Sequence, residues 1–330
     1  MTDKEIKPTP GELNVIKLPP VGMSGRFKLE KFKGTTLPNG EVIELAGSRK
    51  TVAEFDNIIT NQGLNELGTR GFISTLSYFH VGSGNTAAAA TDVALQTFVA
   101  STNTFQSSSS PKQLTTSPYY ASFIQTKRFG QGVAQGNLQE VGVGWASTGS
   151  VLFSRALILD GVGAPTSITI LADEYLDVTY EFRVYPPMGD VTGTVTIAGV
   201  SYDYIARTAD MNTKWSPDSN SNLHGVSLVN GFVYDGNIGT VLTVPAGTSA
   251  SYTSESAPAY SASSLQGVNT NTWGLNNGNL AGGVRSLAQS VGITRWQIQF
   301  NATVGGATIP KDATKTMSFT ITHSWARKTL

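Results

Sequence analysis

Apolar and polar residues alternate over much of this chain, and the clearest example lies between residues 151 and 185. Leu152 to Leu159 carries apolar side chains on both faces, which is typical of a strand buried inside a sandwich. After a Gly- and Pro-containing turn, apolar residues fall on every second position, the period of a strand with one face on a core. These residues are Leu176, Val178, Tyr180, Phe182 and Val184.

A similar pattern recurs near the C-terminus. Ile293 to Phe300 predicts one strand, and Met317, Phe319, Ile321, His323 and Trp325 alternate as a second. The two patterns have nearly the same spacing, with a one-residue difference in the connecting loop. Two interpretations stay open: an internal duplication, or two unrelated sandwich edges built from the same common unit. The predicted core residues are Phe153, Ile170, Val178, Tyr180, Trp296, Phe319 and Ile321.

Shorter runs predict further strands and two short helices. The Asn39-Gly40 dipeptide indicates a hairpin turn. We expect helices at 61–67 and at 92–99, where Thr91 and Asp92 are candidate caps, and an exposed loop at 100–118. Predicted strands cover 26–32, 42–45, 51–59, 78–81, 119–128, 141–145, 194–198, 202–205, 226–234 and 241–244.

Residues 1–25 are rich in proline and glycine, which favours an extended arm over a long helix. The alternative is a disordered tail. Leu13, Val15, Ile16 and Leu18 favour an arm that docks, because large apolar side chains are costly to leave in water.

The sequence therefore predicts an all-β fold with two β-sandwich, jelly-roll-like lobes at 26–190 and 191–330, preceded by the arm. Residues 246–283 are mostly small and polar. We expect this stretch to be disordered or to be ordered by contact with other subunits.

Charged residues make up only 14 % of the chain, and Lys plus Arg equals Asp plus Glu at 23 each. No excess of basic residues points to nucleic acid or to an anionic membrane surface. A net charge near zero is unfavourable for a freely soluble monomer. The composition therefore favours a surface that is covered by partner proteins.

The chain contains no cysteine, which excludes disulfides, thiolate metal sites and a cysteine nucleophile. Its polar N-terminus is unlike a secretory signal, and no apolar run is long enough for a membrane helix. We expect synthesis and folding in a reducing cytoplasm.

Catalytic patterns are weak. His80, His224 and His323 lack ligand spacing, and the first and last fall in predicted strands, where a structural role is expected. The glycine cluster 130–136 has no following helix, so it does not predict a nucleotide site. We therefore predict no enzyme activity, no metal and no cofactor.

Three carboxylates, Asp173, Glu174 and Asp177, precede or begin a predicted strand. They could form a metal site or a glycosidase pair. The favoured interpretation is a solvated turn before the strand. Asp160-Gly161 and Asp235-Gly236 are likewise interpreted as turns.

Aromatic residues in or beside polar loops form the remaining candidate site. They could stack on sugar rings of a host glycan, or they could lie in a subunit interface, where aromatic residues are enriched. The interface interpretation is preferred. The residues are Tyr119, Tyr120, Trp215, Tyr252, Tyr260 and Trp273.

Several segments taken in order resemble structural proteins of tailed-bacteriophage virions, namely tail, baseplate and tail-fibre-associated proteins. The resemblance covers roughly residues 50–210, and this family brings no catalytic residues. The segments are Phe55–Asn65, Val81–Gly84, Thr91–Leu95, Glu140–Gly144, Leu152–Ala156 and Leu176–Glu181.

The resemblance implies a virion subunit, tail or baseplate associated, that is assembled in the host cytoplasm. Its expected partners are copies of itself and other virion proteins, with neither nucleic acid nor membrane insertion. The alternatives are a receptor- or glycan-binding tail fibre protein, which would bind host surface glycan, and a capsid decoration or collar protein.

Overall fold

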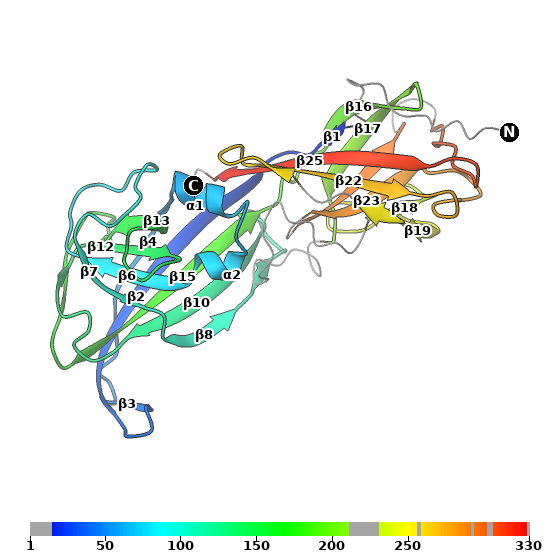
Figure 1. Cartoon of the computed structure of the whole chain (residues 1–330). Helices are drawn as coiled ribbons and strands as arrows, with labels where there is room; N and C mark the ends of the chain where they lie inside the picture. The colour runs from blue at the N-terminus through cyan, green and yellow to red at the C-terminus, as the bar shows by residue number, and fades with distance from the viewer. Residues whose placement is uncertain (1–14, 211–230, 256–258, 292–293, 302–305, 329–330) are drawn as a thin grey trace. The chain divides into compact units, whose positions relative to one another are not determined.

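The computed structural model describes residues 15–210, 231–255, 259–291, 294–301 and 306–328 (Figure 1). Strands account for 52 % of the residues and helices for 4 %, which confirms the predicted all-β class. The chain divides into two compact units. We call the unit that contains residues 22–185 and 326–328 the N-terminal unit. The C-terminal unit contains residues 15–21 and the described residues between 186 and 325.

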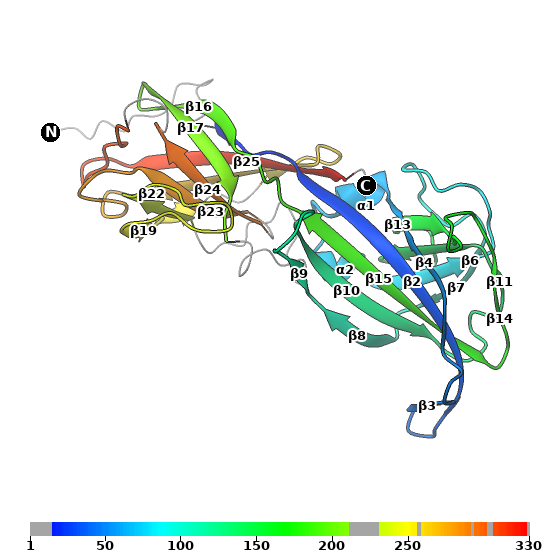
Figure 2. The same cartoon turned by 180° about the vertical axis from the view of Figure 1, so that it is seen from behind.

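The N-terminal unit contains two antiparallel sheets (Figures 1 and 2). The larger sheet is built on β2 (Val21–Thr36), β15 (Glu174–Tyr185) and β10 (Tyr120–Phe129). Strand β2 also pairs with β3 (Val42–Glu44) and β4 (Lys50–Asp56), and β10 pairs with β8 (Phe105–Ser109) and β9 (Lys112–Gln113).

The second sheet of this unit has the order β5-β13-β12-β6-β7. Its strands are β5 (Ile58–Ile59), β13 (Leu152–Leu157), β12 (Glu140–Gly144), β6 (Tyr78–Gly82) and β7 (Phe98–Thr102). A separate pair consists of β11 (Gly136–Leu138) and β14 (Ile168–Ile170), and the helices are α1 (Asn61–Glu66) and α2 (Phe72–Thr75).

Aromatic rings join the two sheets of the N-terminal unit. The ring of Phe153 on β13 lies 5.5 Å from that of Phe182 on β15, and Phe79 on β6 lies 6.4 Å from Tyr180 on β15. All four side chains are buried. Edge-on ring pairs at such distances add to the free energy gained by burying the rings. The unit is therefore held by a core between two facing sheets, as in a β-sandwich.

The C-terminal unit also has two groups of strands. One sheet has the order β16-β17-β24-β23-β18-β19. Its strands are β16 (Val191–Ile197), β17 (Val200–Thr208), β24 (Thr294–Phe300), β23 (Ser286–Val291), β18 (Gly231–Tyr234) and β19 (Ser249–Ser251).

The other group is centred on β22 (Gln266–Trp273), which pairs along its whole length with β25 (Met317–Arg327). The short strands β20 (Ser254–Glu255) and β21 (Ala259–Tyr260) lie on the other side of β22. Strand β1 (Val15–Lys17) pairs in parallel with β25. Phe300 on β24 stacks on Phe319 of β25 at 5.0 Å, so the two groups share a core.

The two patterns noticed in the sequence occupy similar places in their own units. In each unit the first strand, β13 or β24, lies in one sheet and the second, β15 or β25, lies in the other. Each pattern therefore crosses from one sheet of its unit to the other. Internal duplication stays a prediction. All seven predicted core residues are at most 1 % exposed, which confirms that set.

Four local predictions were wrong. Residues 246–283 were expected to be disordered or to be ordered by other subunits, but their described part contains β19 to β22, which pair with strands of the same chain. Residues 92–97 are irregular and 98–102 form β7, so the helix at 92–99 is absent. The predicted strand at 241–244 is irregular, with Leu242 in a left-handed conformation at φ 75°. The predicted loop at 100–118 instead contributes part of β7 and the whole of β8 and β9, which pair with neighbouring strands.

Candidate functional site

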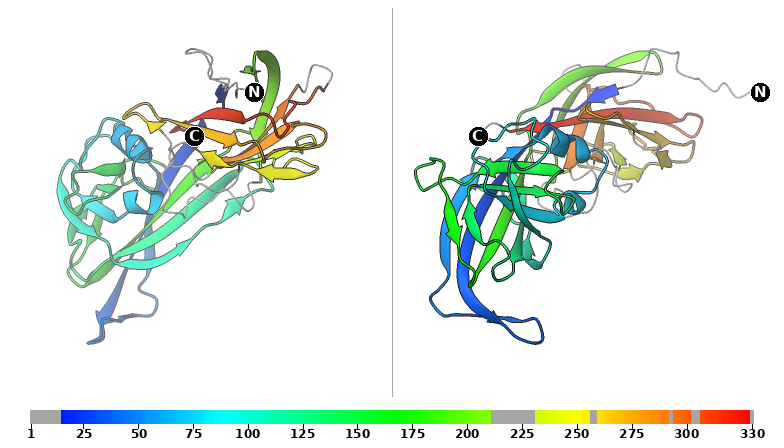
Figure 3. Two further views of the ribbon diagram at one scale, coloured as in Figure 1. Left: turned by 45° about the vertical axis from the view of Figure 1, so that its right-hand side comes forward. Right: turned by 60° about the vertical axis from the view of Figure 1, so that its left-hand side comes forward.

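A hairpin projects from the N-terminal unit, and we call residues 34–46 the projecting hairpin (Figures 1 to 3). Strand β2 pairs with β15 as far as Lys33 and continues beyond it, where Gly34 to Thr36 pair with β3. The predicted Asn-Gly turn closes this hairpin. Gly40 has a φ of 85°, a conformation that glycine adopts without steric cost, and its N–H donates to Leu37 O at 2.9 Å.

Large apolar side chains on this hairpin are exposed. Ile43 is 50 % exposed and Leu45 is 59 % exposed. Beside them lies an open hollow of about 330 Å³, lined by both ends of the hairpin and by Gln131 and Asp173 of neighbouring loops. Exposed apolar side chains gathered at one place are typical of a contact surface.

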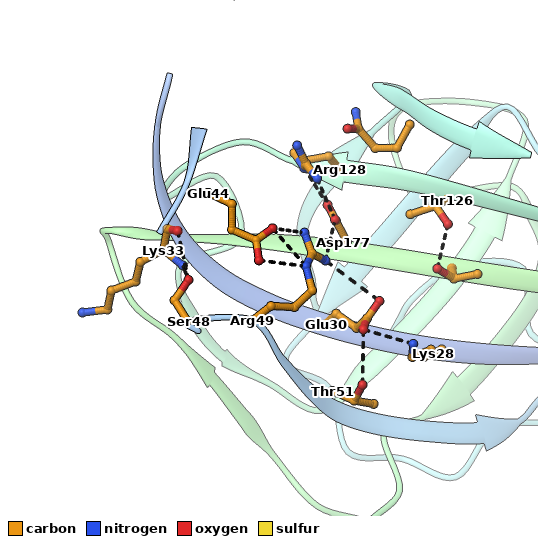
Figure 4. A network of polar contacts seen from close by, with 12 residues as sticks. Lys28, Glu30, Lys33, Glu44, Ser48, Arg49, Thr51, Thr126, Arg128 and Asp177 are labelled. Carbon is orange, nitrogen blue, oxygen red and sulfur yellow. Dashed lines mark hydrogen bonds and ion pairs between the residues drawn. The ribbon is translucent and has the colours of Figure 1, made fainter. Parts of the chain in front are cut away.

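The base of the hairpin is anchored by Arg49 (Figure 4). Its guanidinium forms ion pairs with Glu44 on β3 at 2.6 Å and with Asp177 on β15 at 3.0 Å. It also lies over the ring of Phe32 at 4.3 Å. Arg128 binds the same Asp177 carboxylate at 2.7 Å and lies 4.7 Å from the same ring. Arg49 therefore ties β3 to β15, which lies in the larger sheet of the same unit.

The three carboxylates singled out in the sequence are all ion-paired here. Asp173 pairs with Lys33 at 2.8 Å, and Glu174 pairs with Lys31 at 3.1 Å. The hydrogen bond between Asp173 and Lys33 raises the pKa of Lys33 and lowers the pKa of Asp173. Glu174 and Asp177 are buried within β15. The predicted solvated turn is thus corrected for these two residues, because β15 begins at Glu174.

A second network lies around Glu140, whose side chain is fully buried. Its carboxylate accepts hydrogen bonds from Arg155 Nε at 2.8 Å and from the backbone N–H groups of Gly84, Gln96 and Thr97 at 2.8 to 3.1 Å. Arg155 also binds Asp92 at 2.6 Å. The network holds the loop between β6 and β7. Among the described residues, no group of three or more metal-ligating side chains occurs.

His80 and Lys127 form a buried pair of basic residues in the N-terminal unit. Burial, together with the charge of Lys127, lowers the pKa of His80 to about 4. Burial lowers the pKa of Lys127 to about 8. The Lys127 ammonium donates to the carbonyls of Leu76 and Ser77 at 2.7 and 2.5 Å, at the end of α2. Its contacts are those of a helix C-terminal cap.

The predicted arm residues lie against the chain's own sheet. Ile16 is 0 % exposed and Leu18 is 6 % exposed, while Val15 is half-buried. Parallel pairing with β25 brings them there. Leu13 lies outside the described residues. Residues 15–17 and 21–25 thus belong to the strands β1 and β2, and Ile16 and Leu18 offer no exposed surface, because the same chain covers them.

Two of the predicted aromatic residues lie in the N-terminal unit. Tyr119 and Tyr120 are half-buried. The ring of Tyr120 packs against Tyr185 at 5.6 Å and under the guanidinium of Arg183 at 4.5 Å. Both of these contacts of the Tyr120 ring are therefore with residues of β15.

The aromatic residues of the C-terminal unit pack mainly against one another. Trp273 is fully buried, 5.6 Å from Phe319, and Tyr252 packs edge-on against it at 6.4 Å. Tyr260 stacks on Trp325 at 5.6 Å. Trp215 lies outside the described residues. Trp273 is therefore a core residue, because β22 turns its side chain towards the interior.

The hairpin residues Ile43 and Leu45 were missed as site residues. Their signal was present, since the strand Glu41 to Leu45 carries apolar side chains on both faces beside a tight turn. A strand that projects from its sheet has no core to cover both faces. The projection itself becomes visible only in the structure, where β2 continues beyond the last residue that pairs with β15.

Comparison with protein-family models, with curated proteins and with solved structures finds no match. Among the described residues, no helix is long and apolar enough to span a membrane.

Proposed function

We propose that this protein is a structural subunit that acts by assembling with copies of itself and with neighbouring proteins. The observation that carries this proposal is the projecting hairpin, which exposes Ile43 and Leu45 on a base anchored by Arg49. Burying a fully exposed side chain of this size contributes about 1.5–3 kcal/mol. Because Ile43 and Leu45 are already about half buried, covering the rest contributes roughly half of that for each.

The neighbouring edge strand supports the proposal by contrast. β4 pairs with the same side of β2 and exposes charged residues, namely Lys50, Glu54 and Asp56. Charges on an edge strand oppose pairing with another chain. β3 also carries an exposed charge, Glu44, but that glutamate is paired with Arg49, and the central residue of β3 is the half-exposed Ile43.

The setting that we propose is a tailed-bacteriophage virion, with a place in the tail or baseplate. Support comes from the ordered segments of residues 50–210 that resemble such proteins. In the structure several of these segments meet in one place, because Glu140, Arg155 and Asp92 form a single network. The three segments that contain these residues together anchor the loop between β6 and β7.

The test is the mass of the purified full-length protein in solution, measured by light scattering at micromolar concentrations. We expect a discrete multiple of the chain mass. A monomer at every concentration would contradict self-assembly. Excess salt serves as a control, because association through apolar contacts persists when surface charges are screened.

A further inference from the structure

We infer that the projecting hairpin joins two copies of this chain, with β3 of one copy pairing antiparallel with β3 of the other about a twofold axis at Ile43. This inference rests on the proposed self-assembly and specifies its contact. The larger sheets of the two copies would then be joined edge to edge through their hairpins. Pairing of exposed edge strands is a recurring mode of protein association.

The hydrogen bonds inside the hairpin determine which backbone groups of β3 face outwards. Leu37 N–H donates to Glu41 O at 2.7 Å, and Leu45 N–H donates to Lys33 O at 2.8 Å. In an antiparallel ladder, alternate residues direct their N–H and C=O groups to the same side. Glu41, Ile43 and Leu45 therefore bond towards β2, and the backbone groups of Val42 and Glu44 point away from it.

The outer edge of β3 is unpaired within the part of the chain that the structure describes, where β2 is its sole strand partner. The hairpin extends beyond the rest of the N-terminal unit in every view, so this edge is open to a further strand (Figures 1 to 3). A two-stranded hairpin is marginally stable by itself, and an added strand stabilises it.

A twofold axis at Ile43 places Val42 of each copy opposite Glu44 of the other. Both residues direct their backbone groups outwards, so the two residues of each such pair form two N–H···O=C hydrogen bonds with each other. Ile43 then faces its own copy in a non-hydrogen-bonded pair, where side chains approach most closely. This register covers the half-exposed isoleucine with the same residue of the partner.

Charge distinguishes this register from the two adjacent registers, which have the axis at Glu44 or at Val42. An axis at Glu44 would place two glutamates directly opposite one another, which is destabilising. With the axis at Ile43, each Glu44 faces a valine and keeps its own ion pair with Arg49 at 2.6 Å. An axis at Val42 would set Ile43 against Glu41 of the other copy, whereas the axis at Ile43 sets Leu45 against Glu41. The axis at Ile43 therefore keeps the charge away from the isoleucine at the centre of the contact.

A second copy of the chain is the occupant that this geometry favours. The segment Val42 to Glu44 is complementary to itself in backbone hydrogen bonds, and the axis at Ile43 keeps its two glutamates out of direct opposition. Twofold dimers are also the commonest protein assembly. Residues 1–14 or another virion protein are the competing occupants, and the experiment separates them.

Single cysteine variants test the register directly, because the natural chain has no cysteine. We expect Ile43→Cys to form a disulfide-linked dimer under mild oxidation. The expected Cα separation of about 4.5 Å lies within the range that disulfides span. Val42→Cys and Glu44→Cys are matched controls, which should remain largely unlinked. Faster linking by either control, or equal rates for all three, would overturn the register.

Val42→Pro tests the pairing by mass in solution. Proline at this position removes the outward N–H and leaves the hydrogen bonds towards β2 intact. We expect loss of the dimer. Phe105→Ala is the control, since Phe105 is 55 % exposed on another edge strand, β8, and should leave the dimer unchanged.

The outcomes separate this inference from the proposed function. A native oligomer that survives Val42→Pro, without linking by Ile43→Cys, would overturn the hairpin contact and leave self-assembly standing. If that oligomer were lost on deletion of residues 1–14, the N-terminal segment would be the contact. A native chain that is monomeric throughout would overturn both. If the native chain were found bound through its hairpin to a different protein, and not to a second copy of itself, the inference would also be overturned.

Discussion

Arg155 donates from Nε to the carboxylate of Glu140 at 2.8 Å, and both side chains are almost completely buried. The same carboxylate accepts the backbone N–H groups of Gln96 and Thr97. This pair therefore fixes both a strand and the loop between β6 and β7. Its two members come from adjacent strands, β12 and β13.

Replacing Arg155 by methionine should strongly destabilise the N-terminal unit. The change leaves Glu140 buried without its cation, and breaking a buried ion pair in this way costs about 3–5 kcal/mol. Urea unfolding measures the loss. Arg70→Met is the control, since Arg70 forms an exposed pair with Glu66, and such pairs contribute roughly 0.2–1 kcal/mol. Equal losses in the two variants would contradict the role of the network.

Acidification should destabilise the N-terminal unit before most of its carboxylates titrate. The pKa of His80 is lowered from 6.5 to about 4 by burial and by Lys127. Between these values the unfolded chain binds a proton that the folded chain does not, so stability falls as the pH is lowered from about 6.5 to about 4. The full loss from this residue is about 3 kcal/mol.

Urea unfolding at a series of pH values between 4 and 7 tests this expectation. His80→Phe removes the titrating group and keeps a ring between Tyr78 and Phe98, its neighbours at 6.5 and 6.1 Å. The variant should show a flatter dependence of stability on pH over this range. The same slope in both proteins would assign the effect to other groups.

Trp273→Ala should unfold or strongly destabilise the C-terminal unit. Trp273 is 0 % exposed, and its indole N–H donates to Ala250 O at 3.3 Å. Removing a buried ring of this size costs about 3–5 kcal/mol. Thermal unfolding checks the loss, with Phe105→Ala as the exposed control. A stable Trp273→Ala variant that had lost affinity for a polysaccharide would instead support a glycan site.

Arg49→Gln should loosen the projecting hairpin with a small effect on overall stability. Arg128 continues to pair with Asp177, so the global change is expected to be about 1 kcal/mol. Hydrogen exchange should accelerate in residues 37–46. Lys33→Gln is the matched control at the same base, because its pair with Asp173 is largely exposed. Unchanged exchange in Arg49→Gln would show that the ion pairs do not anchor the hairpin.

Local alternation predicted the principal strands well. The runs at 152–159, 176–184, 293–300 and 317–325 correspond to β13, β15, β24 and β25. A strand with one buried face carries that information in its own residues. The Asn39-Gly40 turn and the helix after Thr60 were recognisable for the same reason, since turn and cap preferences are local.

The errors arise where distant side chains override local preferences. Asp92 was predicted to begin a helix, but its carboxylate binds Arg155 and the N–H of Ala89. β22 escaped prediction because its inward residues include Asn269 and Asn271, which hydropathy assigns to a loop. These amides bond one another, and Asn271 donates to Gln289 of the facing sheet. Paired amides can occupy a core position.

The sequence by itself therefore determined the all-β class, the main strands, their core residues and the hairpin turn. The tertiary structure decided which groups meet. It placed Ile16 and Trp273 in the core, paired Asp177 with two arginines, and left Ile43 exposed on a projecting edge. The reason is physical: alternation and turn preferences act over a few residues, whereas burial and ion pairing depend on strands distant in the chain.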